Sequence, residues 1–559
     1  MENSTPTPSA NPPQAAGSER MVEPAFGLGR FAPFQYERDL HTTLIRPFWK
    51  RIVAWVLVLA VAGWLGLSGA VYVFVKYRRG FTDVQYEHIL FLPWKLQEYR
   101  HSKGEFLIRQ GMAKAKRQEW MAAFGPLRVG LLAVPEDREA RLMVARIYLM
   151  AGRPDMVRTL LIEGLAYHGD QLDYVRESLG FFFGLQADDT VVTLTSELRA
   201  RLPATSPVRR MAVTALAYAY FNRSRLDEAL ALLSEERLQG TPEGRFVMAR
   251  VAWERGRKGD AIGELRELTA QVPDDFEIYR TLVYYLNEEH RWSEVRRAAL
   301  SREFALPDKP EAYVDFIAAC TQDGDETARV AAEAAYWEKF ADDVPALLKL
   351  GEPAARVGRV EVVERVVARC RQLGRETADA EMLLLLAHLE RREYDAVLSA
   401  TAQLSAEAAK WPERQRLVMG GLKAAALYGR GEAVEAEPLV SRLCETQLLP
   451  ATLFTALAEQ LEKVGQGEQA RRVLRHAIEV DPLNQPAEVL LQRSLMKEGA
   501  VEEVAARVER LLTMRKPPVD LLDEVAQALR SDLYLYLPGR AKVEDAIAGY
   551  EQRLREQLR

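Results

Sequence analysis

The chain has 559 residues, which is too long for one ordinary hydrophobic core and predicts either several domains or an extended repeat. Its formal net charge is −5, with basic and acidic residues mixed along the chain, so the composition argues against nucleic acid as a partner. The three cysteines, Cys320, Cys370 and Cys444, are too few and too widely spaced for a disulfide framework or a metal site, and we interpret them as small buried side chains.

Residues 1–45 are predicted to form a disordered N-terminal tail. Prolines are interleaved there with Ser, Thr, Asn and Ala, and few side chains could build a core.

Residues 46–79 predict a single transmembrane helix with basic flanks. Residues 52–75 form an uncharged run of 24 residues, which as a helix would be about 36 Å long and would cross a bilayer core of about 30 Å with some tilt. The run starts too late and is too long for a cleaved signal peptide, and it lacks the polar face of a helix in a soluble core. We therefore expect the lipid bilayer to contact residues 52–75.

The charges beside this run do not decide its orientation. Five basic residues lie within about 25 residues on each side, so the positive-inside rule gives no preference. One early anchor followed by a large domain usually leaves the short tail in the cytoplasm. We therefore expect a single-pass protein of the bacterial inner membrane, with its large C-terminal part outside the cytoplasm.

After a juxtamembrane segment at residues 80–103, small and apolar residues recur with a period of 34. Gly111, Ala145 and Leu179 lie one period apart, and prolines recur where a second helix would end. Small residues let two antiparallel helices approach closely, and proline stops the helix that precedes it. The pattern predicts helical hairpins over residues 104–519.

The string ALAEQLEKVGQGEQARRVLRHAIEVDP, at residues 456–482, resembles a tetratricopeptide repeat (TPR). The positions that carry this resemblance are Leu457, Ala458, Leu461, Gly465, Ala470, Leu474, Ala477 and Pro482. The resemblance implies an all-α fold, a right-handed α-solenoid of about 11 to 12 TPR-like helical hairpins preceded by the single transmembrane helix.

The resemblance is uneven along the chain. The phase slips between Leu172 and Arg210, and the match is poorest over residues 320–450, where helical repeats of another class are an alternative. Residues 520–559 are predicted to be C-terminal capping helices, because the last stretch has the charged outer face that an end repeat needs.

No catalytic spacing is found in the sequence. It lacks HExxH, P-loop, GxSxG and CxxC motifs, and its seven histidines are scattered. We therefore expect no enzymatic activity, no metal, no cofactor and no small-molecule substrate. The alternative is an enzyme or enzyme regulator with a site in the degenerate middle repeats, which a deep polar pocket with converging ionisable groups would favour.

The family resemblance also implies a concave groove, lined by the first helix of each pair, that accepts a peptide or a partner helix. Aromatic residues and arginine are enriched at binding hot spots, and asparagine can hold an extended backbone. The alternative is that these aromatic side chains pack between neighbouring repeats. The candidate groove residues are Tyr218, Phe221 and Asn222 in one unit, Phe246, Arg250 and Trp253 in the next, and Arg280, Tyr284 and Asn287 in a third.

These features predict a membrane-tethered scaffold or assembly factor that binds partner proteins. A narrower version, by analogy of architecture alone, is an accessory protein of a cell-envelope machine for secretion, pilus assembly or polysaccharide export. Another alternative is a structural membrane oligomer, since Ala60, Gly63, Gly66 and Gly69 would permit close contact between two anchors.

Overall fold

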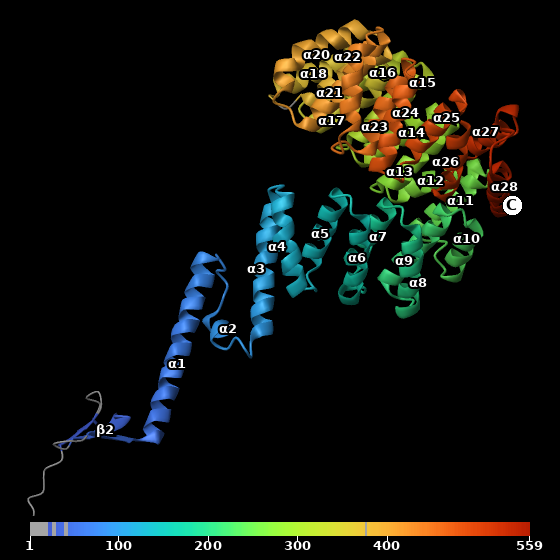
Figure 1. Cartoon of the computed structure of the whole chain (residues 1–559). Helices are drawn as coiled ribbons and strands as arrows, with labels where there is room; N and C mark the ends of the chain where they lie inside the picture. Colours follow the sequence, from blue (N-terminus) through green and yellow to red (C-terminus); the bar gives the residue numbers. More distant parts are fainter. Residues whose placement is uncertain (1–20, 25–28, 39–42, 375–376, 559) are drawn as a thin grey trace, which may run out of the picture. The chain divides into compact units, whose positions relative to one another are not determined.

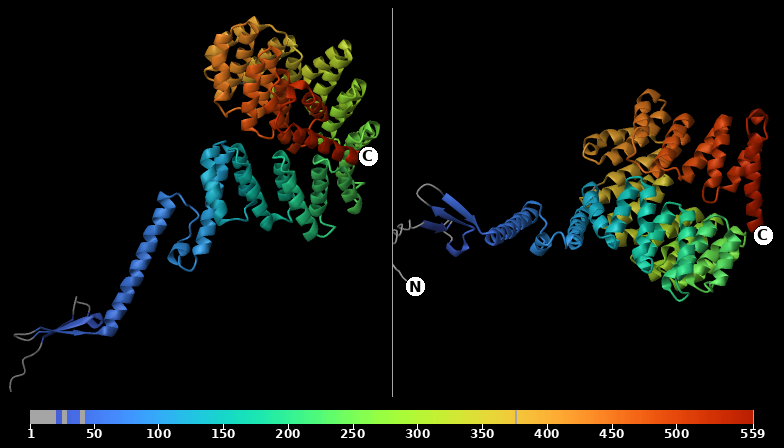
Figure 2. Two further views of the ribbon diagram at one scale, coloured as in Figure 1. Left: turned by 45° about the vertical axis from the view of Figure 1, so that its right-hand side comes forward. Right: turned by 60° about the horizontal axis from the view of Figure 1, so that its bottom comes forward.

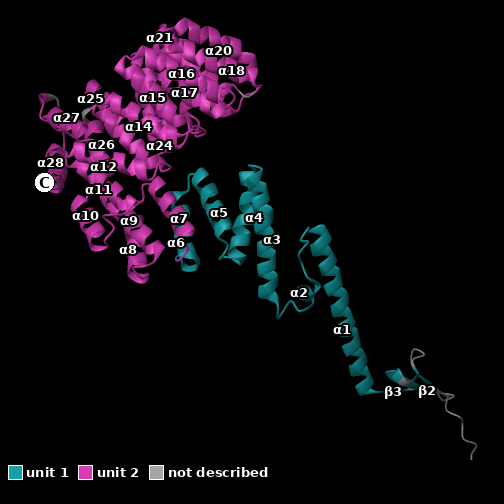
Figure 3. Ribbon diagram, turned by 180° about the vertical axis from the view of Figure 1, so that it is seen from behind, with its two compact units in different colours: residues 1–169 teal, residues 170–559 magenta. Residues whose placement is uncertain are grey.

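The computed structural model describes residues 21–24, 29–38, 43–374 and 377–558 (Figure 1). The chain divides into two compact units, Met1–Gly169 and Asp170–Arg559 (Figure 3). Apart from one small N-terminal sheet, the described elements are helices, so the all-α prediction is confirmed for the repeats.

Three short strands precede the long apolar helix. They are β1 (Met21–Pro24), β2 (Phe34–Arg38) and β3 (Thr43–Pro47), with a 3-10 turn, η2 (Gly29–Phe31), between the first two. They form an antiparallel sheet in the order β1-β2-β3, in which Tyr36 lies opposite Ile45.

The prediction of a disordered tail is wrong for these strands. The composition of residues 1–45 taken together hides two short stretches of aromatic and β-branched residues that favour strands. The part of that prediction that concerns residues 1–20 lies outside the described residues.

The apolar run forms helix α1 (Trp49–Val73), which continues through a π-helical turn, η3 (Phe74–Arg78). Together they make a helix of 30 residues with a mean hydropathy of 2.1 in its most apolar window, long and apolar enough to cross a membrane by length and composition. A short helix, α2 (Tyr86–Leu90), folds back along α1. Trp64 Nε1 donates to the carbonyl oxygen of Leu90 at 2.9 Å, and Ser68, one turn further along α1, is buried.

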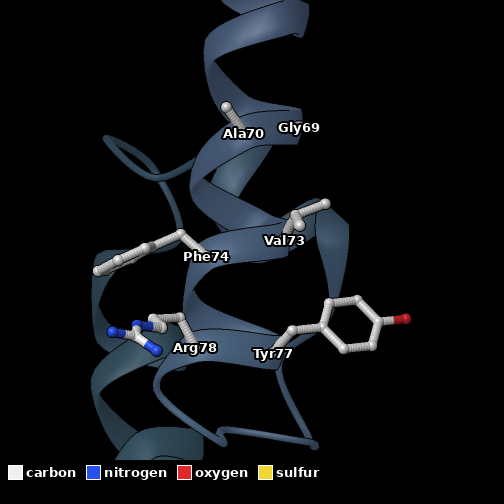
Figure 4. Close-up of a pocket in the computed structure, with 6 residues that line it drawn as sticks. All are labelled: Gly69, Ala70, Val73, Phe74, Tyr77 and Arg78. Atoms are coloured by element: carbon white, nitrogen blue, oxygen red, sulfur yellow. The ribbon is translucent and has the colours of Figure 1, made fainter.

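Small residues leave a shallow depression at the end of α1. Gly69 and Ala70 lie beside Val73, Phe74 and Tyr77, whose side chains stand around it (Figure 4). A Cβ atom built on Gly69 would meet nothing within 4 Å, so this stretch of the helix could accept a close neighbour.

The first unit also contains two antiparallel helix pairs. They are α3 (Leu96–Lys116) with α4 (Trp120–Ala133), and α5 (Arg138–Met150) with α6 (Pro154–His168). A Cβ atom on Gly111 would lie 2.5 Å from Leu127 Cγ, so α3 and α4 can approach this closely only with glycine at position 111.

The second unit continues with ten helix pairs in the described residues. They are α7 (Leu172–Gly184) with α8 (Asp188–Arg201), α9 (Pro207–Asn222) with α10 (Leu226–Glu235), α11 (Pro242–Glu254) with α12 (Lys258–Gln271), α13 (Phe276–Glu288) with α14 (Trp292–Ala305), α15 (Pro310–Asp323) with α16 (Glu326–Phe340), α17 (Val344–Arg356) with α18 (Val360–Gln372), α19 (Ala378–Glu390) with α20 (Tyr394–Ala408), α21 (Glu413–Gly429) with α22 (Ala433–Cys444), α23 (Ala451–Lys463) with α24 (Gly467–Val480), and α25 (Gln485–Glu498) with α26 (Val501–Thr513).

The turn inside each pair has one residue in the left-handed backbone region, and these residues reveal the repeat length. They are Gln118, Gly152, Gln186, Ser224, Gly256, His290, Gly324, Gly358, Arg392, Gly431, Gly465 and Gly499. Most successive members are 34 residues apart, which is the predicted period.

The turn positions also show where the period changes. The interval from Gln186 to Ser224 is 38 residues, which agrees with the predicted phase slip. From Gly324 to Arg392 the period is 34 throughout, so the repeat length is kept in that part of the region with the poorest match. The remaining long interval, 39 residues, runs from Arg392 to Gly431 and reflects the longer helices α20 and α21.

Two of the three cysteines are fully buried, as predicted. Cys320 and Cys370 lie in the core, and Cys444 is half-buried, all as free thiols.

The C-terminal end of the second unit contacts the first repeats of the same unit. It consists of α27 (Val519–Leu529), η4 (Asp532–Tyr534) and α28 (Arg540–Leu558), and α28 reaches α10 (Figure 2). The backbone N–H of Asp227 donates to Gln557 Oε1 at 3.1 Å, and Arg255 Nε donates to the Gln557 carbonyl oxygen at 3.2 Å. The segment predicted as an end cap therefore joins the two ends of this unit.

Candidate functional site

The structure brings six of the nine predicted groove residues together on α9 and α11. The Arg250 guanidinium lies 4.4 Å from the Phe221 ring centroid and 4.7 Å from that of Tyr218, and it also donates a hydrogen bond to the Tyr218 hydroxyl. Phe221 and Phe246 are buried, and Asn222 is 6% exposed and donates to Asp188 Oδ1 at 3.1 Å.

Trp253 packs between neighbouring helix pairs. Its ring stacks on Tyr285 at 3.8 Å with an interplanar angle of 4°. For Trp253 and Phe221 the geometry therefore matches the alternative in which the aromatic side chains hold consecutive repeats together.

The three predicted residues of α13 are exposed and lie apart from this cluster. Tyr284 is 56% exposed, Asn287 is exposed, and Arg280 donates to Glu277 Oε2 at 2.7 Å on the same helix.

A segment from the far end of the chain lies against the α9–α11 cluster. We call it the 514–518 segment: it joins α26 to α27 and contains Arg515, Lys516 and two prolines. Lys516 Nζ lies 3.3 Å from the Phe221 ring centroid and donates to Glu254 Oε1 at 2.6 Å. Burial lowers the pKa of Lys516 from its ordinary value of 10.5 to about 8, and the Glu254 carboxylate opposes part of this shift.

A second concave surface is open in the structure. It is a groove of about 630 Å³, which we call the α17–α23 groove, lined by the first helices of four consecutive pairs: α17, α19, α21 and α23. Its floor is apolar. The floor residues are Leu348, Met382, Leu383, Leu386, Val418, Leu422, Leu453 and Leu457.

Charged side chains of both signs form the rim of the α17–α23 groove. They are Lys349, Glu352, Arg356, Asp379, Glu390, Arg414, Glu459 and Lys463. Several are paired: Glu390 Oε1 accepts from Gln460 Nε2 at 2.8 Å and from Lys463 Nζ at 2.5 Å. These two bonds join α19 to α23 across two repeats.

One polar atom of the groove lining lacks a hydrogen-bond partner within the described part of the chain. The side-chain oxygen of Gln415, on α21, is buried without a hydrogen bond among the described residues. Such an acceptor favours a donor on whatever occupies the groove, because an unpaired buried polar atom costs about 1–3 kcal/mol.

The α17–α23 groove was not predicted, although a signal for it exists in the sequence. Leu348 and Met382 lie 34 residues apart, as do Leu422 and Ala456, so equivalent first-helix positions recur across the lining. The weak TPR match over residues 320–450 kept these positions from being assigned. No comparable signal points to the 514–518 segment, whose contacts span more than 260 residues.

Comparisons with known proteins add little beyond this geometry. No family model matches the chain. A stretch of 80 residues, 13% of the chain, is 34% identical to the cellulose synthase operon protein C of Xanthomonas axonopodis pv. citri (strain 306). The match spans only 5% of that curated relative's length.

Three of the solved structures that are similar to this chain are described next. The Naa15/Naa10 complex bound to HypK-THB has 15% identity and a TM-score of 0.28, with 89% of this chain and 78% of that chain covered. Yeast Tom70 has 11% identity and a TM-score of 0.29, with coverages of 81% and 96%. The Cut9–Hcn1 tetramer of the APC/C has 11% identity and a TM-score of 0.26, with coverages of 78% and 98%. The description of this chain as a helical-repeat protein rests on its own helix pairs and 34-residue period.

Proposed function

We propose that the chain is a membrane-tethered scaffold or assembly factor that binds a partner protein in the α17–α23 groove. The observation that carries this proposal is the groove itself, in which four consecutive first helices present an apolar floor between charged rims. Apolar pockets with a few polar groups at the edge bind protein segments by burying apolar side chains and fixing direction at the rim.

The expected occupant is an extended segment of a partner protein rather than a helix. An extended backbone has free N–H groups, whereas those in the middle of a helix are already bonded within it. One of these N–H groups could satisfy the unpaired Gln415 oxygen. The mixed rim would suit a segment with apolar side chains that is flanked by charges of both signs.

Helix α1 supports the proposed tether. It is almost fully exposed along its apolar window, and basic residues flank it at Lys50, Arg51 and Arg78. We propose a single-pass protein of a bacterial inner membrane, with the repeats outside the cytoplasm. The short likeness to a cellulose synthase operon protein suits the narrower role in polysaccharide export among the envelope machines considered.

We also propose that the chain has no catalytic activity of its own. The α17–α23 groove lies where an enzyme site was the alternative, but its floor is apolar, and on the rim Glu390 accepts hydrogen bonds from Gln460 and Lys463. This arrangement suits binding better than acid–base chemistry.

The proposal is tested by changing the groove floor. Leu386→Glu combined with Val418→Glu would place two charges on an apolar surface. We expect the captured amount of at least one partner protein to fall at least ten-fold. Partners are identified by mass spectrometry after affinity purification of the full chain from solubilised membranes.

The matched control is Val434→Glu on α22, where the side chain is 89% exposed and outside the groove. This variant should retain the wild-type partners. If the groove variant keeps its helical circular dichroism and captures the same partners in the same amounts, the α17–α23 groove is not the binding site.

A further inference from the structure

The 514–518 segment interacts with the first repeats of its unit through a fully buried carboxylate. Asp188, the first residue of α8, is 0% exposed. Arg515 Nε donates to Asp188 Oδ2 at 2.5 Å and Arg515 Nη2 donates to Oδ1 at 2.6 Å, while Nη1 donates to the Phe183 carbonyl oxygen at 3.2 Å. This fork arrangement is the strongest geometry for an arginine–carboxylate pair.

The next residue, Lys516, occupies a second position on the same surface. Lys516 Nζ lies over the Phe221 ring and bonds to Glu254, so two consecutive cations each have their own carboxylate. Asn222 completes the first position by donating to Asp188. We call the surface formed by Phe183, Asp188, Phe221, Asn222 and Glu254 the Arg-Lys site.

The segment that fills the Arg-Lys site has the properties of a bound peptide. It lies outside any helix, and Pro517 and Pro518 restrict the backbone after the two cations. Its backbone is held on the other side by Gln485 Nε2, which donates to the Lys516 carbonyl oxygen at 3.1 Å. Lys516 itself has a backbone φ of 44°, a strained value for a residue with a side chain, which the contacts on both sides maintain.

We infer that the Arg-Lys site is a binding site for a basic, proline-containing peptide segment, and that Met514–Pro518 of the same chain occupies it as an internal ligand. A partner with the same chemistry competes with the 514–518 segment for this site. This inference concerns a different surface from the α17–α23 groove and does not depend on the function proposed for that groove.

The covalent connection explains why the site is filled from within. Helices α26 and α27 hold the 514–518 segment beside the site, which gives it a high effective concentration. A free peptide therefore binds measurably only when the internal segment has been weakened.

The experiment uses a fluorescent peptide of residues 512–519 and the full chain in detergent. Fluorescence anisotropy compares the wild type with the double variant Arg515→Ala, Lys516→Ala. We expect the double variant to bind the peptide at least ten-fold more tightly than the wild type. A peptide with alanine in place of Arg515 and Lys516 should not bind, and Asp188→Asn added to the double variant should abolish binding.

A second pair of variants covers the case in which the double variant does not fold. Arg515→Gln combined with Lys516→Gln removes both charges and keeps side chains of similar length, so it should also admit the peptide. Adding Glu254→Lys to this variant puts a cation in the second position and should exclude the peptide again. The inference is overturned if the folded alanine double variant, or the folded glutamine double variant, binds the peptide no better than the wild type. Neither outcome of the peptide experiment bears on the α17–α23 groove, which is tested separately by the loss of partner proteins from the groove variant.

Discussion

At the scale of single residues, contacts between repeats determine whether an aromatic or charged side chain stabilises the fold or is accessible to a binding partner. Arg250 contacts rings from its own helix and from α9, so its charge is used inside the solenoid wall. Position on the first helix of each pair, together with residue type, identified this cluster from the sequence. It could not identify the role, because the orientation of Trp253 and Phe221 depends on how far one helix pair is rotated against the next.

Asp315 gives a prediction at this scale. It lies on α15, where the Tyr279 hydroxyl of α13 donates to Asp315 Oδ2 at 2.8 Å, and Glu311 and Arg302 are the charged groups that act on it. Burial raises the pKa of Asp315 from 3.8 to about 6, and the bond from Tyr279 opposes only part of the rise.

The folded protein therefore binds a proton on the Asp315 carboxyl group more tightly than the unfolded chain does. The stabilisation that protonated Asp315 gives is fully present below pH 3.8 and is lost as the pH rises through about 6, so the local free energy of unfolding should fall by up to about 3 kcal/mol between these limits. Asp315→Asn should remove this dependence, measured by hydrogen exchange of α13 to α15 at pH 4 and pH 7. Asp308→Asn, at a 93% exposed carboxylate, should leave it unchanged. An identical pH response of wild type and Asp315→Asn would contradict the prediction.

At the scale of elements, helix type and period were the most predictable features. The 34-residue spacing follows from one hairpin and its turn, which is local information. The sheet formed by β1 to β3 and the fold-back of α2 were missed, because short elements depend on contacts that composition does not encode.

The fold-back of α2 changes how much of the apolar run we expect to lie in a bilayer. Tyr86 OH donates to the Leu65 carbonyl oxygen at 3.3 Å, so α2 lies beside the second half of the apolar run, and it brings Glu87 and Lys95 with it. A charged side chain deep in a bilayer costs about 2.5–3.5 kcal/mol or more. The uncharged stretch from Ile52 to Ser68 has 17 residues and is about 26 Å long as a helix, which is at the short end of the lengths that cross the hydrocarbon core.

We therefore expect the hydrocarbon boundary near Ser68 rather than at residue 75. In membranes of a background without native cysteines (Cys320→Ala, Cys370→Ala and Cys444→Ser), a cysteine at Val58 should be protected from a water-soluble maleimide and a cysteine at Val71 should be labelled. Both should be labelled after denaturation in detergent, which controls for reactivity. Protection of Val71 would mean that the bilayer extends further and that α2 leaves α1 in the membrane.

For the second unit as a whole, the contact between its ends distinguishes this chain from an open repeat. In an open solenoid each pair is stabilised mainly by its neighbours, so a change at one end decays along the chain. Here Leu558 packs into the core formed by α9 to α11, and Gln557 bonds to Asp227 and Arg255. Sequence spacing could not predict this closure, because it depends on the sum of small rotations over ten helix pairs.

The closure predicts long-range coupling within this unit. Gln557→Ala combined with Leu558→Ala should accelerate hydrogen exchange in α9 to α11, about 300 residues away in sequence, because it removes the hydrogen bond to Gln557 Oε1 and the apolar burial of Leu558, together worth about 1–3 kcal/mol. Arg555→Ala, which breaks only the exposed pair with Glu551 inside α28, should have no such effect. If exchange changes only in α26 to α28, the two ends are independent, and the 514–518 segment must be held by α26 and α27 without help from α28.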